Sequence, residues 1–311
     1  MALSISQALA VSFAAVLNRM RGKPENQWSD HSLLNFLQKK GGMKRESLGP
    51  TIECTLDYRM NPGGAFMLTD MDPVATNKTE VITAASYSVA ELSVPIVWSK
   101  KDEATNPTEN QKVNLVKSLL ENAINTHDDL IEQALFTTST NGFLGFGTHI
   151  TDAGTGSDGG IDSSTETFWR NKQATYVDDT DIEAAFTSVW NACAKGSGSD
   201  LVPSILVSDG ATQAIYEGVL QPLQRYGPTD EGNSGFKVLK FKNADYVFSQ
   251  YGTTDVYFIN AKNFNVVGSK EYFRDLGETI EFPGQQAYIR KIYSALQSIT
   301  NNRSRLGVAH V

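Results

Sequence analysis

The feature that most constrains the fold of this chain is an uninterrupted helical pattern over residues 106–137. Apolar residues recur there at the spacing of one helix face, and they are Val113, Val116, Leu120, Ile124, Leu130, Ile131 and Ala134. At its start, Asn106 suits the N-cap, Pro107 the first helical position and Glu109 the acid of a capping box. With a rise of 1.5 Å per residue the helix would be about 45 Å long. Such a rod is unusual in a compact enzyme and natural in a structural strut.

Two extended segments precede this helix and predict a long two-stranded ribbon. Residues 51–60 alternate apolar and polar side chains, which is the period of a half-buried strand. A second extended run covers residues 79–98, and Pro95 within it favours an edge strand. Because an isolated ribbon is only marginally stable in water, we expect it to lie on another surface.

The loop between these two strands carries an apolar group, which is the candidate contact site of the chain: Phe66, Met67, Leu68 and Met71. Folded proteins normally avoid apolar clusters at loop tips. The group therefore predicts a contact with another subunit. The alternative is a loop that folds back onto its own core.

The rest of the chain predicts an α+β fold with segregated elements. A second helix is predicted over residues 180–195, beginning with a capping box at Thr180 and Glu183. A further helix, capped by Ser208 or Asp209, follows a short buried strand. The predicted strands lie at 204–208, 237–242, 244–249, 255–260, 264–267 and 286–300.

The net charge is −8, from 27 Lys and Arg against 35 Asp and Glu, and it is unevenly distributed. Residues 1–50 contain seven basic and three acidic residues and so carry +4, which leaves −12 for the remainder. The overall balance excludes a protein whose whole surface binds nucleic acid. The basic arm can attract another copy of the acidic body or a polyanion such as packaged DNA. A solvated charge run is the third interpretation.

The sequence contains no signature of a phosphate-binding loop, a serine-hydrolase elbow or a zinc-protease helix. His127 continues the inward stripe of the long helix, so we expect it to be buried and hydrogen-bonded. Asp152, Asp158 and Asp162 lack the spacing of a calcium loop. The acidic cluster of Asp178, Asp179, Asp181 and Glu183 is expected to begin a helix, where negative charge is favourable.

The two cysteines, Cys54 and Cys193, exclude a disulfide framework and lie on apolar faces, which favours small core residues. We therefore expect no catalytic residue, no cofactor and no metal site. No apolar run approaches the ~18 residues of a membrane helix, so no membrane partner is expected. Residues 8–17 are apolar but no basic residue precedes them, which favours a docked arm over a targeting signal.

In the order of its elements, the whole chain resembles the major capsid proteins of tailed bacteriophages. The stretches that carry the resemblance are GGID at 159–162 followed by FWRN at 168–171, LVSDG at 206–210, and ITNNRSRLGV at 299–308. No long helical segment precedes the arm, so a built-in scaffolding region is not expected. No constellation of residues supports a covalent cross-link at Lys78.

The resemblance implies a division into five parts: an N-terminal arm at 1–50, an extended β-loop at 51–100 that overlies a neighbouring subunit, a peripheral domain at 101–200 with a spine helix (106–137) and a second helix (180–195), an axial domain at 201–284, and a return strand of the peripheral domain at 285–311. It implies a structural subunit, not an enzyme, that forms the pentamers and hexamers of an icosahedral head around double-stranded DNA.

The partners implied by the resemblance are many copies of the chain itself and packaged DNA, bound non-specifically on the inner face. Separate scaffolding, portal and decoration proteins are further candidates. The location would be the virion capsid, and the host cytoplasm during assembly. The first alternative is an encapsulin-type bacterial compartment that encloses enzymes. The second is an α+β hydrolase or transferase with an unrecognised site.

Overall fold

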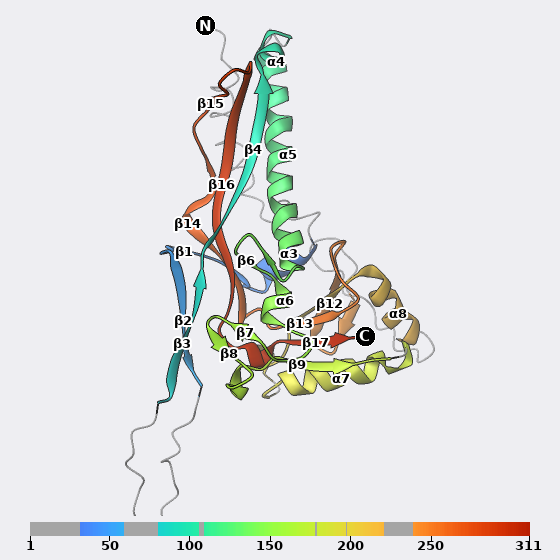
Figure 1. The fold of residues 1–311 in the computed structure, drawn as a ribbon. Helices are drawn as coiled ribbons and strands as arrows, with labels where there is room; N and C mark the ends of the chain where they lie inside the picture. Colours follow the sequence, from blue (N-terminus) through green and yellow to red (C-terminus); the bar gives the residue numbers. More distant parts are fainter. Residues whose placement is uncertain (1–31, 59–79, 106–108, 178, 197, 221–238) are drawn as a thin grey trace, which may run out of the picture.

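The computed structural model describes the whole chain except residues 1–31, 59–79, 106–108, 178, 197 and 221–238. In Figure 1 an elongated unit built from α5 (Glu109–Leu135), β4 (Ala90–Ser99) and β16 (Ala287–Thr300) rises from a wider body. The ribbon of β2 (Thr51–Asp57) and β3 (Ile82–Ser88) leaves the body in the opposite direction. The predicted α+β class is confirmed.

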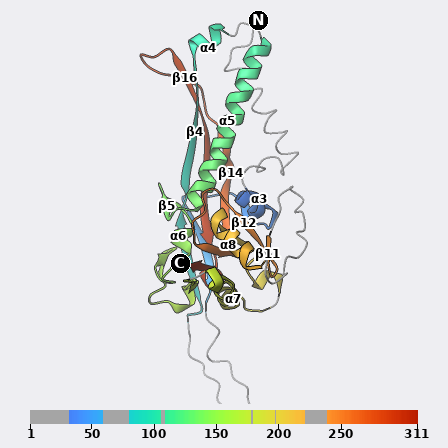
Figure 2. The ribbon, with the colours of Figure 1, turned by 90° about the vertical axis from the view of Figure 1, so that its right-hand side faces the viewer.

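The elongated unit is a sheet that α5 covers on one face (Figure 2). The strands run in the order β1 (Met43–Glu46), β14 (Phe264–Leu276), β16 and β15 (Ile280–Glu281), and β4 pairs antiparallel with β16 along its whole length. Alternate residues of β4 point toward α5 and pack there, as the period of a strand requires; these are Val94, Ile96 and Trp98. Since β16 is the only described neighbour of β4, the predicted edge strand with Pro95 is confirmed.

The long helix is confirmed over residues 109–135, whereas the predicted cap at Asn106 and Pro107 lies outside the described residues. Val116, Leu120, Ile124 and Ile131 are buried on its inward face. Leu130 is exposed, contrary to the prediction, because it lies at the edge of the buried helix face and not at the centre of that face. A short helix, α4 (Lys100–Thr105), connects β4 to α5.

The body contains a six-stranded sheet in the order β11 (Leu239–Phe241), β12 (Ala244–Phe248), β10 (Ile205–Ser208), β13 (Val256–Ile259), β17 (Gly307–His310) and β9 (Lys172–Thr175). One face packs against α7 (Ile182–Cys193) and α8 (Gly210–Leu220) around Phe186, whose ring contacts four other aromatic rings. The Oδ1 atom of Asp209 accepts a hydrogen bond from the backbone N of Thr212 at 2.8 Å, so the predicted cap of α8 is confirmed.

The capping box predicted at Thr180 and Glu183 is wrong. A 3₁₀ turn, η2 (Asp179–Asp181), precedes α7, and the N-cap residue is Asp181 in a helical backbone conformation without a side-chain capping bond. The buried stripe predicted for this helix is confirmed at all six positions: Ile182, Ala185, Phe186, Val189, Trp190 and Cys193. Packing against the sheet therefore fixes the helix where local capping does not.

The predicted ribbon is too long. The run over residues 79–98 divides at Val89, because β3 pairs with β2 whereas β4 joins the elongated sheet beside β16. The backbone N of Val89 donates to Pro50 O at 3.2 Å, which closes the base of the ribbon. The alternation of apolar and polar residues predicts a strand in both halves of the run. It does not determine which other strand each half pairs with.

Part of the predicted N-terminal arm belongs to the body. Helix α3 (Ser32–Lys39) buries Leu33, Leu34 and Leu37 in the main core, and β1 pairs in parallel with β14. The ammonium of Lys40 pairs with Asp245 at 2.7 Å, so a basic residue of this segment is used within the chain. The expected N-terminal arm at residues 1–50 therefore does not include residues 32–46, which pack within the body.

The two sheets share one core, in which residues of both lie together: Val207 and Ile259 from the body with Phe264 and Leu296 from the elongated sheet. β9 and α7 pack with the body although they precede residue 200. The last strand, β17, also joins the body, whereas β16 lies in the elongated sheet. The domain limits expected at residues 200 and 285 thus do not coincide with the limits of the sheets.

Candidate assembly site at the base of the ribbon

The apolar group expected to contact a neighbour, at Phe66, Met67, Leu68 and Met71, lies outside the described residues. The structure does describe the place where the ribbon is anchored. There Leu56, Ala85 and Tyr87 of the ribbon pack with Trp169 and with two residues of the elongated sheet, Val267 and Ile299. The orientation of the ribbon is therefore set by buried side chains of the body.

A tight turn between β7 (Ser157–Asp158) and β8 (Ile161–Asp162) holds the ribbon against the body. Gly159 in this turn has φ +60°, and a Cβ atom placed on it would lie 2.7 Å from the Cβ of Ala85. The backbone N of Ser86 donates to Gly159 O at 2.9 Å. Only glycine combines this backbone conformation with so close an approach, which explains the GGID stretch noted in the sequence.

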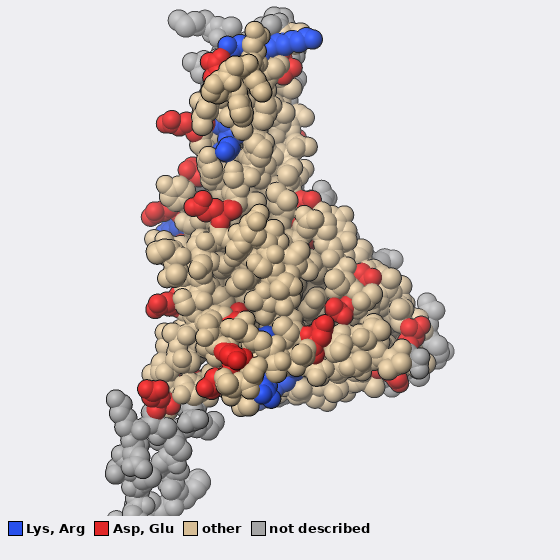
Figure 3. All heavy atoms as spheres, in the orientation of Figure 1, with Lys and Arg blue, Asp and Glu red and all other residues tan. Residues whose placement is uncertain are grey.

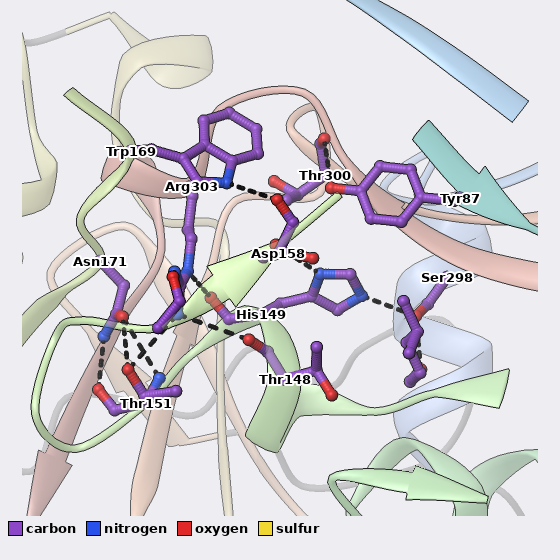
Figure 4. Close-up of polar contacts among 12 residues, drawn as sticks. Tyr87, Thr148, His149, Thr151, Asp158, Trp169, Asn171, Ser298, Thr300 and Arg303 are labelled. Atoms are coloured by element: carbon purple, nitrogen blue, oxygen red, sulfur yellow. Dashed lines mark hydrogen bonds and ion pairs between the residues drawn. The ribbon is translucent and has the colours of Figure 1, made fainter. Parts of the chain in front are cut away.

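Arg303, in the 3₁₀ turn η5 (Arg303–Arg305), anchors the same loop and is fully buried. As Figure 4 shows, its guanidinium points into the loop over residues 148–163. It donates hydrogen bonds to His149 O, Gly156 O, Ser163 Oγ, Thr148 O and Thr151 Oγ1. Burial lowers the pKa of Arg303, and the charge of Asp158 acts in the opposite direction. Arg303 lies within the 299–308 stretch, but no local sequence pattern predicts that its side chain is buried.

His149 connects the loop to β16 through both ring nitrogens (Figure 4). Nε2 lies 2.8 Å from Ser298 Oγ, and Nδ1 lies 3.0 Å from Asp158 Oδ2. The Ser298 hydroxyl donates its proton to Leu144 O, so Nε2 must be the donor toward Ser298. His149 thus holds Ser298 of β16 with one ring nitrogen and Asp158 of the loop with the other.

A second buried network lies further along the same strand. His127 Nδ1 contacts Asp128 Oδ1 at 2.9 Å, and Nε2 contacts Ser294 Oγ at 2.8 Å. Asp128 also forms an ion pair with Arg274, whose backbone N donates to Ser294 Oγ at 2.8 Å. The Ser294 proton is therefore free for His127 Nε2, and burial lowers the pKa of His127, so this histidine is neutral. The expectation of a buried, hydrogen-bonded His127 is confirmed.

Both networks place a serine, a histidine and an aspartate in the order of a hydrolase triad. Their histidines are completely buried, and no substrate carbonyl can reach either serine. What they do is join β16 to its surroundings: His127 ties it to α5, and His149 ties it to the loop that carries the ribbon. Sequence reasoning did not find the pairing, because the two histidines lie 167 and 149 residues from their serines.

The other residues singled out in the sequence have structural positions. Asp158 is buried against His149, and no group of three or more metal-binding side chains occurs in the described part of the chain. Burial raises the pKa of the Cys193 thiol to about 12, as suits a core residue, and Cys54 is half-buried beside the ribbon base. None of the described helices is long and apolar enough to cross a membrane.

Beside the base of α5 the structure has an apolar hollow of about 370 Å³. It is lined by Ala90 and Leu92 of β4 and by Leu130 and Ala134 of α5. Phe143 completes the lining from the short hairpin of β5 (Ser139–Thr140) and β6 (Phe143–Leu144). The exposed Leu130 thus belongs to a concave apolar surface.

Comparison with known proteins shows a shared fold without sequence similarity. No family model matches the chain, and no curated protein matches it. The capsid of cyanophage A-1(L) superposes with a TM-score of 0.60 and 13% identity, over 87% of this chain and 90% of that one. The native GTA particle capsid gives 0.57 and 10% over 88% and 89%. The capsid of myovirus XM1 gives 0.51 and 14% over 87% and 90%.

The chain therefore has the fold of bacteriophage capsid subunits over nearly its whole length. The resemblance noted from the order of its elements is confirmed at the level of the fold.

Proposed function

We propose that this chain is the major capsid protein of a phage head, which assembles in many copies into pentamers and hexamers around double-stranded DNA. The observation that carries the proposal is the likeness of 87–88% of the chain to capsid subunits. The projecting ribbon and the elongated sheet support it, because such elements add little to their own core and much to a neighbour. One patch meeting a different patch on the next copy generates rings and closed shells.

Within this function the elongated sheet with α5 corresponds to the peripheral domain and spine helix, and the six-stranded body corresponds to the axial domain. Residues 51–88 form the loop that overlies a neighbour, and its tip at 66–71 makes the contact. The N-terminal arm is then confined to residues before α3. Packaged DNA, a scaffolding protein, a portal and decoration proteins are the further partners, in a virion capsid assembled in the host cytoplasm.

Of the alternatives, the encapsulin-type shell is less favoured, since the similar structures described above are capsids of phages and of the GTA particle. A catalytic role is not proposed, because the two serine–histidine–aspartate networks are closed to substrate.

The mass of the purified full-length chain tests the proposal. We expect particles far heavier than the 34.0 kDa subunit in light scattering, with closed shells in electron micrographs. A monomer that remains single at high concentration contradicts the proposal. Shells that copurify with an enzyme, in place of nucleic acid, would support the encapsulin alternative.

A further inference from the structure

Three basic residues converge at the C-terminal end of α7, and we call them the basic cluster: Lys172, Lys195 and Arg305. The backbone N of Lys195 and the Nη1 atom of Arg305 both donate to Leu201 O, at 3.2 and 2.8 Å. Lys172, the first residue of β9, donates its backbone N to Leu306 O at 2.9 Å. Figure 3 shows Lys and Arg atoms gathered at this lower edge of the body, on a surface that otherwise carries mainly Asp and Glu.

The basic cluster carries positive charge that the subunit does not neutralise. Within the described part of the chain, none of its three side chains pairs with a carboxylate, and the neighbouring Asp200 pairs with Lys262. Partial burial, followed by the charges of Arg305 and Lys172, lowers the pKa of Lys195, so the three cations act on one another. The end of a helix favours cations by only about 0.3–1 kcal/mol. The charge of the basic cluster therefore favours the binding of an anionic group from another molecule.

The opposite face of the same strands carries the complementary charge. Side chains alternate along a strand, so Lys172 points toward α7 whereas Gln173 and Thr175 point away, where both contact His310. Asp255 lies near His310 on this far face, and burial, followed by the charge of Asp152, raises the pKa of Asp255. Asp152 and Asp255, the acidic pair, form no ion pair with a described residue.

We propose that the basic cluster docks a second copy of this chain, through the acidic pair on that copy. The two surfaces lie on opposite faces of the β9–β17 edge, so the contact is heterologous and runs head to tail, which is the arrangement that closes a ring. With 35 Asp and Glu against 27 Lys and Arg, each copy carries an excess of carboxylates that can meet such a cluster. Complementary charge then fixes the register of neighbours and suppresses other arrangements. This inference rests on the proposed function and names a surface for it.

The test is a charge exchange in the full-length chain. Lys195→Glu and Asp152→Lys each place like charges together across the contact, so each should raise the concentration needed for assembly about tenfold or more. The double variant carries the pair reversed and should return to near the wild-type value. Assembly is followed by light scattering at low and high salt, and the circular dichroism spectrum of each variant checks that the subunit is folded. Lys270→Glu, an exposed lysine on β14, is the control and should assemble normally.

Two results would overturn the inference while wild-type shells still uphold the proposed function. One is normal assembly of both single variants. The other is a double variant no better than its parents. If the Lys195→Glu variant assembles normally but its shells retain less DNA, the cluster binds phosphate groups instead. Failure of the wild-type chain to form shells would contradict the proposed function itself.

Discussion

At the scale of single residues, buried polar groups hold together segments that are remote in sequence. Arg303 satisfies carbonyl and hydroxyl groups of a loop about 150 residues earlier. Lysine keeps the charge but has three donors in place of five. We expect Arg303→Lys to lower the free energy of unfolding by about 2–4 kcal/mol, since each buried group left unpaired costs about 1–3 kcal/mol. Urea unfolding of the unassembled subunit measures this. Arg170→Lys, which alters a half-exposed guanidinium, is the control, and an equal effect there would contradict the assignment.

His127 makes the folded subunit sensitive to acid. Burial lowers its pKa in the folded chain, whereas the unfolded chain keeps a value of about 6.5. Below pH 6.5 the unfolded state therefore binds a proton that the folded state resists, and stability falls as the pH falls. We expect His127→Gln to reduce the loss of unfolding free energy between pH 7 and pH 5. The measurement is urea unfolding at both pH values, and an unchanged pH dependence would show that His127 does not contribute.

At the scale of elements, the β7–β8 turn decides how the ribbon is held. Gly159→Ala would drive a methyl group into Ala85 and strain a positive φ, so we expect loss of amide-exchange protection at Ser86. Gly160 has φ +81° but open space around its Cβ position, so Gly160→Ala carries the backbone strain without the clash. Hydrogen exchange on the unassembled subunit compares the two variants. Equal loss of protection in both would mean that the close approach to Ala85 is unimportant.

The contact proposed for Phe66, Met67, Leu68 and Met71 is tested by assembly. We expect Phe66→Asp and Met67→Asp to leave a folded subunit and to impair shell formation, because a charge replaces an apolar contact between copies. Thr69→Asp adds the same charge next to the apolar group and serves as the control. Electron microscopy and circular dichroism measure the two properties separately. Normal particles from both apolar-site variants would count against the predicted contact.

At the scale of the whole molecule, the shared core makes the two sheets one cooperative unit. Trp98 reports on the elongated sheet and Trp190 on the body, and residues of both sheets meet around Phe264. We therefore expect the unassembled subunit to unfold in a single transition. The fluorescence of each tryptophan is the difference between the wild type and the Trp98→Phe or Trp190→Phe variant. Both fluorescence signals should give the same unfolding midpoint as circular dichroism. Two separate midpoints would show that the sheets fold independently.

By itself the sequence determined those features that depend on neighbours along the chain. The periods of α5 and α7, the alternation of β2 and β4, and the cap of α8 follow from spacing and from local hydrogen bonding. The order of these elements was sufficient for the resemblance to capsid subunits. An inward histidine such as His127 could also be recognised, because its helix face was already defined.

Only the tertiary structure decided which elements pair and which charges are buried. Alternation marks β4 as a strand, but its pairing with β16 depends on burying Val94 and Ile96 against α5, and that choice is made by packing across the chain. The basic residues of α3 and β1 were expected to belong to an N-terminal arm, whereas the apolar face of α3 packs in the core. Long-range hydrogen bonds such as those of Arg303 leave no local pattern, since their partners are brought close only by folding.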